Sequence, residues 1–224
     1  MTHLSSSISD TRTAKLSYPD PISDSFLEED FKQQFQIAGP LLMYVGNLES
    51  YQGIDLLLDS FAQIIPEDPT AHLVVIGGTS ADIEKYQTQI QRQQTADNIH
   101  FVGPRPIQDL KHYLNQADIV VSPRTQGENT PMKLYSYLDS GKALVATKLT
   151  THTQVCNDQI AVLAEPTVGA FSSGILQLVN NPELRTQLGA AAQAYIAREH
   201  TFHVFSQKLS SLYDWLNSEL SVAT

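Results

Sequence analysis

The sequence has little cysteine and no excess of positive charge. Cys156 is the only cysteine among 224 residues, which excludes an internal disulfide framework and a multi-cysteine metal site. Lysine and arginine number 14 against 24 aspartates and glutamates, so the formal net charge is −10, and no basic cluster stands out. Because nucleic-acid binding depends on a basic surface, we expect no nucleic-acid partner.

Long apolar runs and metal-ligand spacings are also missing. No run approaches the roughly 18 to 20 apolar residues that a membrane-spanning helix needs, and residues 1–13 lack the apolar core of a signal peptide. We therefore predict a cytoplasmic protein without a membrane span, and peripheral association with a membrane stays open. The seven histidines are scattered, with no pair at ligand spacing on one helix face, so we predict no metal site.

The chain is instead rich in alternating strand and helix patterns after residue 38. Short β-branched and leucine-rich runs predict strands at 41–45, 73–76, 99–102, 119–121, 144–146 and 160–163. Apolar residues at helical spacing predict helices at 54–65, 82–94, 107–115, 130–139, 183–198 and 202–220. This alternation is typical of βαβ units with parallel strands. We predict an α/β fold with a doubly wound, Rossmann-like parallel sheet and a long C-terminal helix.

The first 38 residues differ in character from the rest. Residues 1–24 are rich in Ser, Thr, Asp and Pro with few large apolar side chains, a composition that buries too little surface to offset ordering entropy. Residues 26–37 carry apolar groups near helical spacing and end before Gly39 and Pro40, which predicts a short amphipathic helix. We therefore divide the chain into a linker or tail, 1–38, and one domain, 39–224.

Glycines follow the first four predicted strands. Gly46, Gly77, Gly103 and Gly127 stand in these strand-to-helix loops, where ligands of doubly wound sheets bind. Glycine lets backbone approach a ligand closely, although any one of the four is also explained as an ordinary turn residue. Neither the dinucleotide-binding fingerprint nor a P-loop is present. The four together favour a crevice for a ligand at one edge of the sheet.

Residues 122–147 hold the densest group of chemically useful side chains. Thr130 followed by Pro131 predicts the start of a helix, whose free N–H groups suit a phosphate. Lys133 in the first turn costs a helix a few tenths of a kcal/mol unless an anion binds there. Glu128 can accept hydrogen bonds from sugar or ribose hydroxyls, or it only complements the helix dipole, and both interpretations stay open.

These residues, in their order, resemble the donor-binding domain of family-4 (group 1) glycosyltransferases of the GT-B fold. The specific part runs from Gly127 to Thr147 and includes the run Asn-Thr-Pro-Met-Lys at 129–133. Val-Gly-Asn at 45–47 and Tyr-Gln-Gly at 51–53 agree in order with the same pattern. The resemblance covers about residues 40–218.

The resemblance implies that a nucleotide sugar is the donor substrate and that no cofactor is needed. Its diphosphate would lie at the helix start near Thr130, its sugar near Glu128, and Glu128 and Lys133 would be the catalytic residues. The other donor-binding residues that it implies are Gly46, Asn47, Gln52, Gly77, Gly103, Arg124, Asn129, Thr130, Pro131, Met132 and Ser136.

Three positions depart from the family's pattern. Ser136 stands where the family has the second glutamate of a Glu-x7-Glu pair, and Asn47 and Gln52 stand where it has cations that neutralise the leaving diphosphate. Lys133 and Arg124 are the nearby cations that can compensate. Either the chain uses a different phosphate clamp, which we favour, or it is a catalytically silent binding or assembly module.

The family also has an acceptor domain before the donor domain, and residues 1–38 are too few to form one. We therefore expect the acceptor to be held by a missing or separate N-terminal domain protein. The apolar face of 202–220 meets either such a partner or the chain's own core, and we favour the core. That face consists of Phe202, Phe205, Leu209, Leu212 and Trp215.

Four further residues have structural interpretations. His152, in a loop between threonines, is expected to be a hydrogen-bonded structural residue rather than a catalyst. Asp118 is expected to cap the preceding helix or to face solvent. Of Tyr135 and Tyr137, one is expected to pack in the core while the other faces out.

Overall fold

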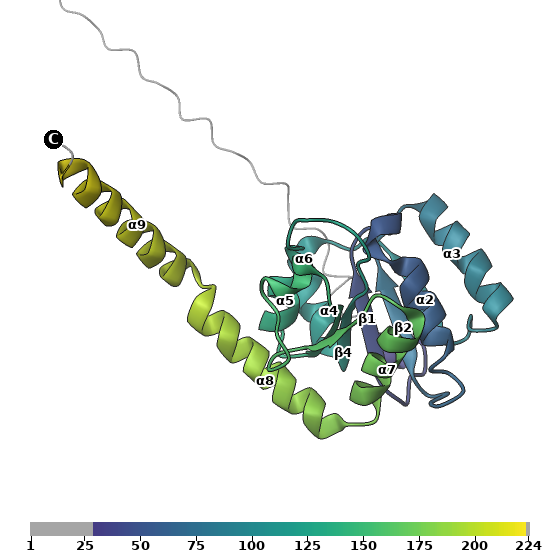
Figure 1. The fold of residues 1–224 in the computed structure, drawn as a ribbon. Coiled ribbons are helices and arrows are strands. Elements are labelled where there is room, and N and C mark those ends of the chain that lie inside the picture. Colours follow the sequence, from purple (N-terminus) through teal and green to yellow (C-terminus); the bar gives the residue numbers. More distant parts are fainter. Residues whose placement is uncertain (1–28, 223–224) are drawn as a thin grey trace, which may run out of the picture.

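The computed structural model describes residues 29–222 and centres on a parallel sheet (Figure 1). Its strands are β1 (Leu41–Val45), β2 (His72–Ile76), β3 (Ile99–Gly103), β4 (Ile119–Ser122), β5 (Ala143–Thr147) and β6 (Val162–Ala164). They lie in the order β3-β2-β1-β4-β5-β6, so the chain reverses its direction of winding between β1 and β4. The predicted doubly wound, Rossmann-like sheet is confirmed, and each predicted strand overlaps an observed one.

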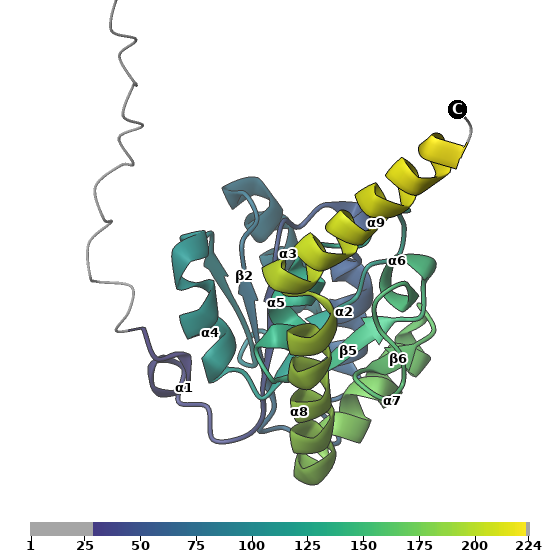
Figure 2. The ribbon, with the colours of Figure 1, turned by 90° about the vertical axis from the view of Figure 1, so that its left-hand side faces the viewer.

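Helices cover both faces of this sheet (Figure 2). One face is covered by α2 (Ile54–Ala62), α3 (Ser80–Gln93) and α7 (Val168–Val179). The other is covered by α1 (Phe31–Gln34), α4 (Leu110–Gln116), α5 (Lys133–Asp139) and α8 (Pro182–Glu199). Three short helices lie in the connections between these elements: η2 (Ser50–Gln52), η3 (Ile107–Asp109) and α6 (Thr150–Thr153).

Strand side chains alternate between the two helix layers. In β1, Leu42 and Tyr44 pack with the α2, α3 and α7 layer, whereas Leu41 and Met43 pack with the opposite layer. All four are fully buried. Because the strands are buried on both faces, neither face is exposed to solvent, and the strand sequences are therefore nearly continuous apolar runs.

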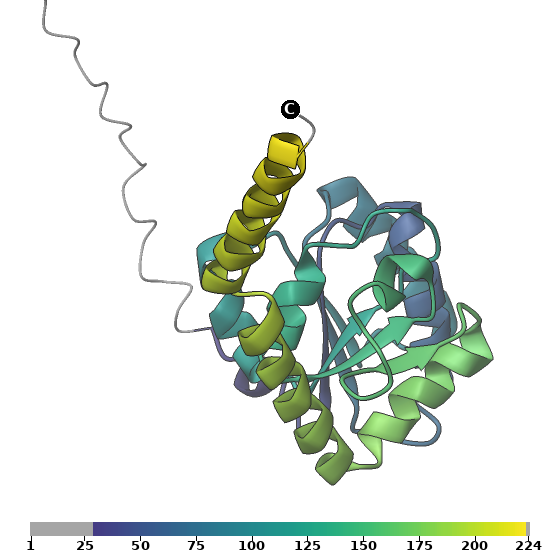
Figure 3. The same ribbon diagram turned by 60° about the vertical axis from the view of Figure 1, so that its left-hand side comes forward.

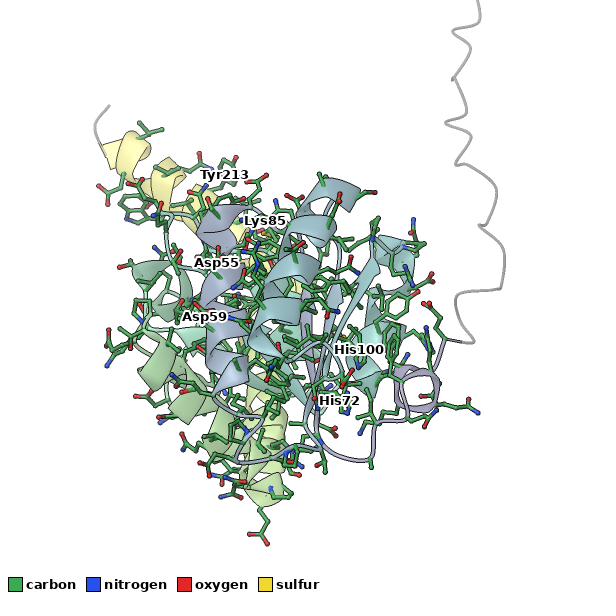
Figure 4. All side chains as sticks on the ribbon, turned by 90° about the vertical axis from the view of Figure 1, so that its right-hand side faces the viewer. Asp55, Asp59, His72, Lys85, His100 and Tyr213 are labelled. Carbon is green, nitrogen blue, oxygen red and sulfur yellow. The ribbon has the colours of Figure 1, made fainter. Side chains whose placement is uncertain are left out.

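The pairing of α2 with α3 is polar at its outer rim (Figure 4). The Tyr86 hydroxyl lies 3.4 Å from Asp55 Oδ2, and the Lys85 amine lies 4.4 Å from the centre of the Tyr86 ring. One turn along α2, Asp59 accepts hydrogen bonds from the amides of Gln89 and Gln93. The hydrogen bonds to Asp55 and Asp59 therefore fasten the polar helix α3 to α2.

Residues 29–37 pack on the same core as the sheet. Phe31 is fully buried, with its ring 5.6 Å from that of Tyr113, and Asp30 caps α1 by accepting from the Gln33 amide. The helix predicted at 26–37 is therefore short, and its first residues lie outside the described range, as do residues 1–24. The boundary between residues 38 and 39 stays a prediction.

Asp118 joins this N-terminal segment to the sheet. Its Oδ2 accepts hydrogen bonds from the Leu41 amide at 2.8 Å and from Lys32 Nζ at 2.7 Å. The expectation that Asp118 caps the preceding helix or faces solvent is wrong, because two groups distant in sequence occupy its carboxylate.

The predicted helix at 130–139 starts three residues later than expected. α5 begins at Lys133, and Met132 stands at the N-cap without a side-chain cap. The Thr130 hydroxyl donates instead to Gln154 Oε1 at 2.8 Å. The N-cap role predicted for Thr130 and the first-turn role of Pro131 are therefore wrong, because a contact across the fold takes the hydroxyl.

The last helix, α9 (Phe202–Val222), extends away from the sheet (Figures 1 and 3). Its apolar side chains remain in solvent, with exposed fractions from 39% at Leu209 to 83% at Phe202 for the five residues singled out above. The expectation that this face packs on the chain's own core is wrong. Among residues 29–222, every helix is too short or too polar to cross a membrane.

Candidate donor site

Three of the predicted glycine loops meet at the carboxyl edge of the sheet. The Gly46 amide donates to the Ile76 carbonyl at 3.0 Å, and the Gly77 amide donates to the Gly103 carbonyl at 2.8 Å. Gly77 has φ +115°, and a Cβ there would lie 2.1 Å from the Gly46 carbonyl oxygen. Only glycine permits this approach of the β1 and β2 loops.

A cavity of about 500 Å³ lies between the carboxyl end of β1 and α5, at the point where the strand order reverses. Its lining residues are Val45, Gly46, Asn47, Gln52, Ile107, Leu110, Arg124, Pro131, Met132, Lys133, Tyr135, Ser136 and Tyr137. Most of the sequence-predicted site residues are among them. Gly77, Gly103, Glu128, Asn129 and Thr130 are not. The apolar wall formed by Ile107 and Leu110 was missed, since nothing in the sequence marks those two residues as different from core residues.

Lys133 supplies the positive charge of this cavity. Its Nζ lies 3.2 Å from Gln52 Oε1 and 4.0 Å from the centre of the Tyr44 ring. Burial, and to a smaller extent the nearby charge of Arg124, lowers the pKa of the Lys133 amine to about 7. The amine is therefore close to half protonated at neutral pH, and an anion in the cavity would favour its charged form.

Two buried tyrosines shape the wall beside this amine. The Tyr44 hydroxyl donates to the Asn47 carbonyl at 2.7 Å, and the Tyr137 hydroxyl accepts from the Val45 amide at 2.7 Å. Burial raises the pKa of both hydroxyls, so both remain neutral. Tyr137 is fully buried while Tyr135 is half-buried on the cavity wall, which confirms the expected division between the two.

Arg124 fastens the loop between β4 and α5 rather than reaching into the cavity centre. Its Nε donates to the Gln126 carbonyl at 2.6 Å and its Nη1 to the Asn129 carbonyl at 3.0 Å. Gly127, at φ +124°, lies against this guanidinium, and a Cβ there would lie 2.2 Å from Arg124 Nη2. The loop residues 123–131 thus wrap around one arginine.

Glu128 lies on this loop between the two carbonyls that Arg124 holds. Its side chain is exposed and is not part of the cavity lining. The carboxylate is therefore solvated, on a loop of which Arg124 and Pro131 line the cavity. Nothing in its contacts decides between the two interpretations of Glu128.

His152 is buried below the loop, in α6. Its Nε2 lies 2.9 Å from Ser122 Oγ and its Nδ1 lies 2.8 Å from the Thr147 carbonyl oxygen. Burial lowers the pKa of the imidazole to about 4. The structural interpretation is confirmed, although the residue lies in a short helix rather than in a loop. In the part of the chain that the structure describes, no three His, Cys, Asp or Glu residues group as metal ligands.

The model of the family "Glycosyl transferases group 1" matches residues 25–195. The chain belongs to this family. It is 23% identical over 198 residues to phosphatidyl-myo-inositol mannosyltransferase of Mycobacterium tuberculosis, covering 85% of this chain and 51% of that protein. It is 26% identical over 182 residues to D-inositol 3-phosphate glycosyltransferase of Corynebacterium diphtheriae, covering 77% of this chain and 42% of that protein. The chain thus spans about half the length of the curated relatives that it matches.

Solved structures of the same fold agree with this assignment. Anabaena Alr3699/HepE in complex with UDP superposes with a TM-score of 0.73 at 19% identity, over 86% of this chain and 54% of that one. The C-terminal domain of the Francisella tularensis group 1 glycosyltransferase LpcC superposes with a TM-score of 0.66 at 18% identity, over 78% of this chain and 94% of that one. The architecture is therefore the GT-B donor-domain fold that the resemblance implied.

Proposed function

We propose that this chain binds the diphosphate of a nucleotide sugar in the cavity between β1 and α5 and takes part in glycosyl transfer. The observation that carries the proposal is the Lys133 amine, which lies in a cavity at the switch point of the sheet beside the backbone of Gly46. A Cβ at Gly46 would lie 3.2 Å from Lys133 Nζ, so the missing side chain leaves the backbone open to an anion held by that amine. UDP in the Anabaena Alr3699/HepE structure and UDP-glucose in a second structure of that protein support a donor of this class.

Lys133 would act on the leaving group. Breaking the bond between sugar and diphosphate develops negative charge on the diphosphate, and a cation fixed in a low-dielectric cavity stabilises that charge. Glu128, exposed on the loop beside the cavity, would accept hydrogen bonds from sugar hydroxyls. The proposal includes no metal or cofactor, and the positive charge that it places against the diphosphate is that of the Lys133 amine.

We assign the acceptor to a second domain, in the same polypeptide or in a separate chain. A further cavity of about 530 Å³ lies beside the donor cavity and shares Met132 and Tyr135 with it. Phe202 and Phe205 of α9 line its far side and are exposed. A domain that covers this apolar face would bring its acceptor to the edge of the donor cavity.

We also propose that the protein is cytoplasmic, since its lone cysteine gives no disulfide framework.

A second candidate function is binding without turnover. Asn47 and Gln52 are neutral, and both line the cavity where the diphosphate would lie. Ser136, a third neutral residue, lines the same wall. A site with one buried amine has less charge to stabilise a leaving diphosphate than a site with several.

Calorimetry on the purified chain tests the first part of the proposal. We expect UDP-glucose, GDP-mannose or another member of a nucleotide-sugar panel to bind, and absence of binding across the panel would overturn the donor-site proposal. Mixing the chain with an acceptor-domain protein then separates the two candidates. Release of nucleotide above background supports transfer, whereas binding without release supports the silent module.

A further inference from the structure

The loop that carries Glu128 is fastened at both ends to one short element, α6 and the residue after it. At the start of the loop, Ser122 Oγ lies 2.9 Å from His152 Nε2. At its end, Thr130 Oγ1 donates to Gln154 Oε1 at 2.8 Å. His152 and Gln154 are two residues apart, whereas Ser122 and Thr130 stand on either side of residues 123–129 of the loop.

The hydrogen-bond directions at His152 follow from its neighbours. The Thr147 carbonyl oxygen, 2.8 Å from Nδ1, can only accept, so Nδ1 carries the proton. Nε2 is then the acceptor for the Ser122 hydroxyl. The Thr147 hydroxyl in turn donates to the Arg124 carbonyl at 2.5 Å. Ser122, Thr147 and His152 are fully buried, so removing one member leaves a buried partner without its hydrogen bond.

These contacts continue into the middle of the loop. Thr147 holds the backbone of Arg124, whose guanidinium holds the carbonyls of Gln126 and Asn129 on either side of Glu128. His152 and Gln154 do not line the donor cavity. Their hydrogen bonds therefore act on the loop and not on the cavity wall itself.

We infer that His152 and Gln154 are positioning residues that brace both ends of the loop 123–131 and so set where Glu128 meets the sugar of the donor. The claim that the brace positions Glu128 against the sugar rests on the proposed donor function. The claim that His152 and Gln154 brace the loop concerns the unliganded chain alone. The two claims are tested by separate measurements.

Hydrogen exchange in the unliganded chain tests the brace. Thr130→Val removes the hydroxyl and keeps the shape, Thr130→Ser keeps the hydroxyl, and Gln154→Leu removes the acceptor. We expect amides of residues 124–130 to exchange about fivefold faster in Thr130→Val and Gln154→Leu, the effect of losing roughly 1 kcal/mol of local hydrogen bonding. Thr130→Ser should match the wild type. Thr153→Ala, an exposed neighbour on α6, is the matched control.

Calorimetry tests the effect on the donor. In Gln154→Leu and Ser122→Ala, we expect the gain in affinity from nucleoside diphosphate to nucleotide sugar to fall about fivefold, or roughly 1 kcal/mol. The affinity for the diphosphate alone should stay at the wild-type value. In a Glu128→Gln background, Gln154→Leu should have no further effect on the sugar, because both act through one carboxylate.

The outcomes separate the brace from a general loss of stability. Unchanged exchange at 124–130 in Thr130→Val and Gln154→Leu would overturn the inference, and so would equal losses for diphosphate and nucleotide sugar. If the wild type binds no nucleotide sugar, the proposed function fails on that result alone. The exchange rates then still decide whether α6 braces the loop.

Discussion

The Lys133 amine lies 4.0 Å from the centre of the Tyr44 ring, over the face of a fully buried tyrosine. The negative face of an aromatic ring attracts a cation, and this attraction grows when the pair is desolvated. Gln52 Oε1, 3.2 Å from the same amine, is its hydrogen-bond acceptor in the cavity. Neither neighbour is charged, so the amine remains able to pair with an incoming anion.

Replacing Lys133 should therefore weaken binding of the diphosphate. We expect Lys133→Gln to raise the dissociation constant for the preferred nucleoside diphosphate about tenfold or more, which is roughly 1.4 kcal/mol. Titration calorimetry measures the effect. Lys148→Gln, an exposed lysine after β5, is the matched control and should bind as the wild type does. Equal losses in both variants would contradict a specific role for Lys133.

Donor binding should also depend on pH. The diphosphate of a nucleotide sugar keeps its charge near neutral pH, whereas the pKa of Lys133 is lowered to about 7 and an anion raises it again. Binding then takes up a proton, so affinity is greatest below pH 7 and falls as the pH rises above 7. Calorimetry in buffers of different ionisation enthalpy should detect this proton. A pH slope that persists in Lys133→Gln would assign it to another group.

The Lys133 amine also predicts that the free energy of unfolding of the unliganded chain rises with pH, the opposite of the pH dependence of donor affinity. The folded pKa of Lys133, about 7, lies below its ordinary value of 10.5, so the unfolded chain binds more protons between these values. The free energy of unfolding should therefore rise with pH from 7 to 10.5. Urea unfolding across this range should show a smaller rise in Lys133→Gln than in the wild type. Identical slopes would show that the amine is charged in the folded state.

Glu128 should matter for the sugar and not for the diphosphate. We expect Glu128→Gln to lower affinity for the nucleotide sugar about fivefold, since a charged acceptor is worth roughly 1 kcal/mol more than a neutral one. Affinity for the matching diphosphate should not change. Glu165→Gln, an exposed carboxylate after β6 at the same sheet edge, is the control. Intact sugar binding in Glu128→Gln would contradict a role for Glu128 in holding the sugar.

A histidine pair on β2 and β3 predicts sensitivity to acid (Figure 4). His72 Nδ1 lies 3.0 Å from His100 Nε2, and the Phe35 ring stacks on His100 at 3.9 Å. Burial, then the neighbouring His72, lowers the pKa of His100 to about 4, against 6.5 ordinarily. The unfolded chain thus binds more protons between pH 6.5 and 4, so stability should fall as the pH falls through this range.

A variant separates this pair from the other titrating groups. His100→Phe keeps an aromatic partner for Phe35 and removes the titration, so its unfolding free energy should change less between pH 6.5 and 4. His203→Phe on the exposed α9 is the control and should keep the wild-type slope. Equal slopes in all three proteins would contradict the prediction.

The exposure of α9 can be checked with the one tryptophan of the chain. Trp215 is 56% exposed, so its fluorescence should be that of a solvated indole and should change little on unfolding. Leu212→Ser on the same helix should leave the unfolding midpoint nearly unchanged. Phe171→Ala, in the core, should cost about 3–5 kcal/mol. A blue-shifted Trp215 in the isolated chain would mean that α9 is covered.

The strands could be predicted because the residues that begin and end each apolar run are its immediate neighbours in sequence. Leu41–Val45 is a continuous apolar run between Pro40 and Gly46, and β1 has those same bounds. α7 was missed for a local reason as well, since Gly169 and Gly174 interrupt its apolar pattern. In the structure, a Cβ at Gly174 would lie 3.2 Å from Val162, so this glycine allows the helix to approach the sheet.

For the candidate site, the sequence indicated which residues lie near one another better than it indicated their geometry. The order of motifs pointed to Lys133 and Gly46, and the fold brings both to one cavity. The start of α5 depends on the contact of Thr130 with Gln154, 24 residues away, which no local signal contains. The burial of Lys133 likewise depends on Tyr44 and Gln52, from elements distant in sequence. For α9, an amphipathic pattern indicates an apolar face but does not indicate what covers it.

An uncovered α9 also has a thermodynamic consequence. Most of the stability of a protein helix comes from packing its apolar face, and α9 leaves that face in solvent, so α9 gains little from the sheet. Covering its apolar face would remove nonpolar surface from water and lower the heat capacity of the complex. Donor contacts around Glu128 are polar and would change the heat capacity much less. The temperature dependence of the binding enthalpy therefore tells which of the two surfaces a given partner uses.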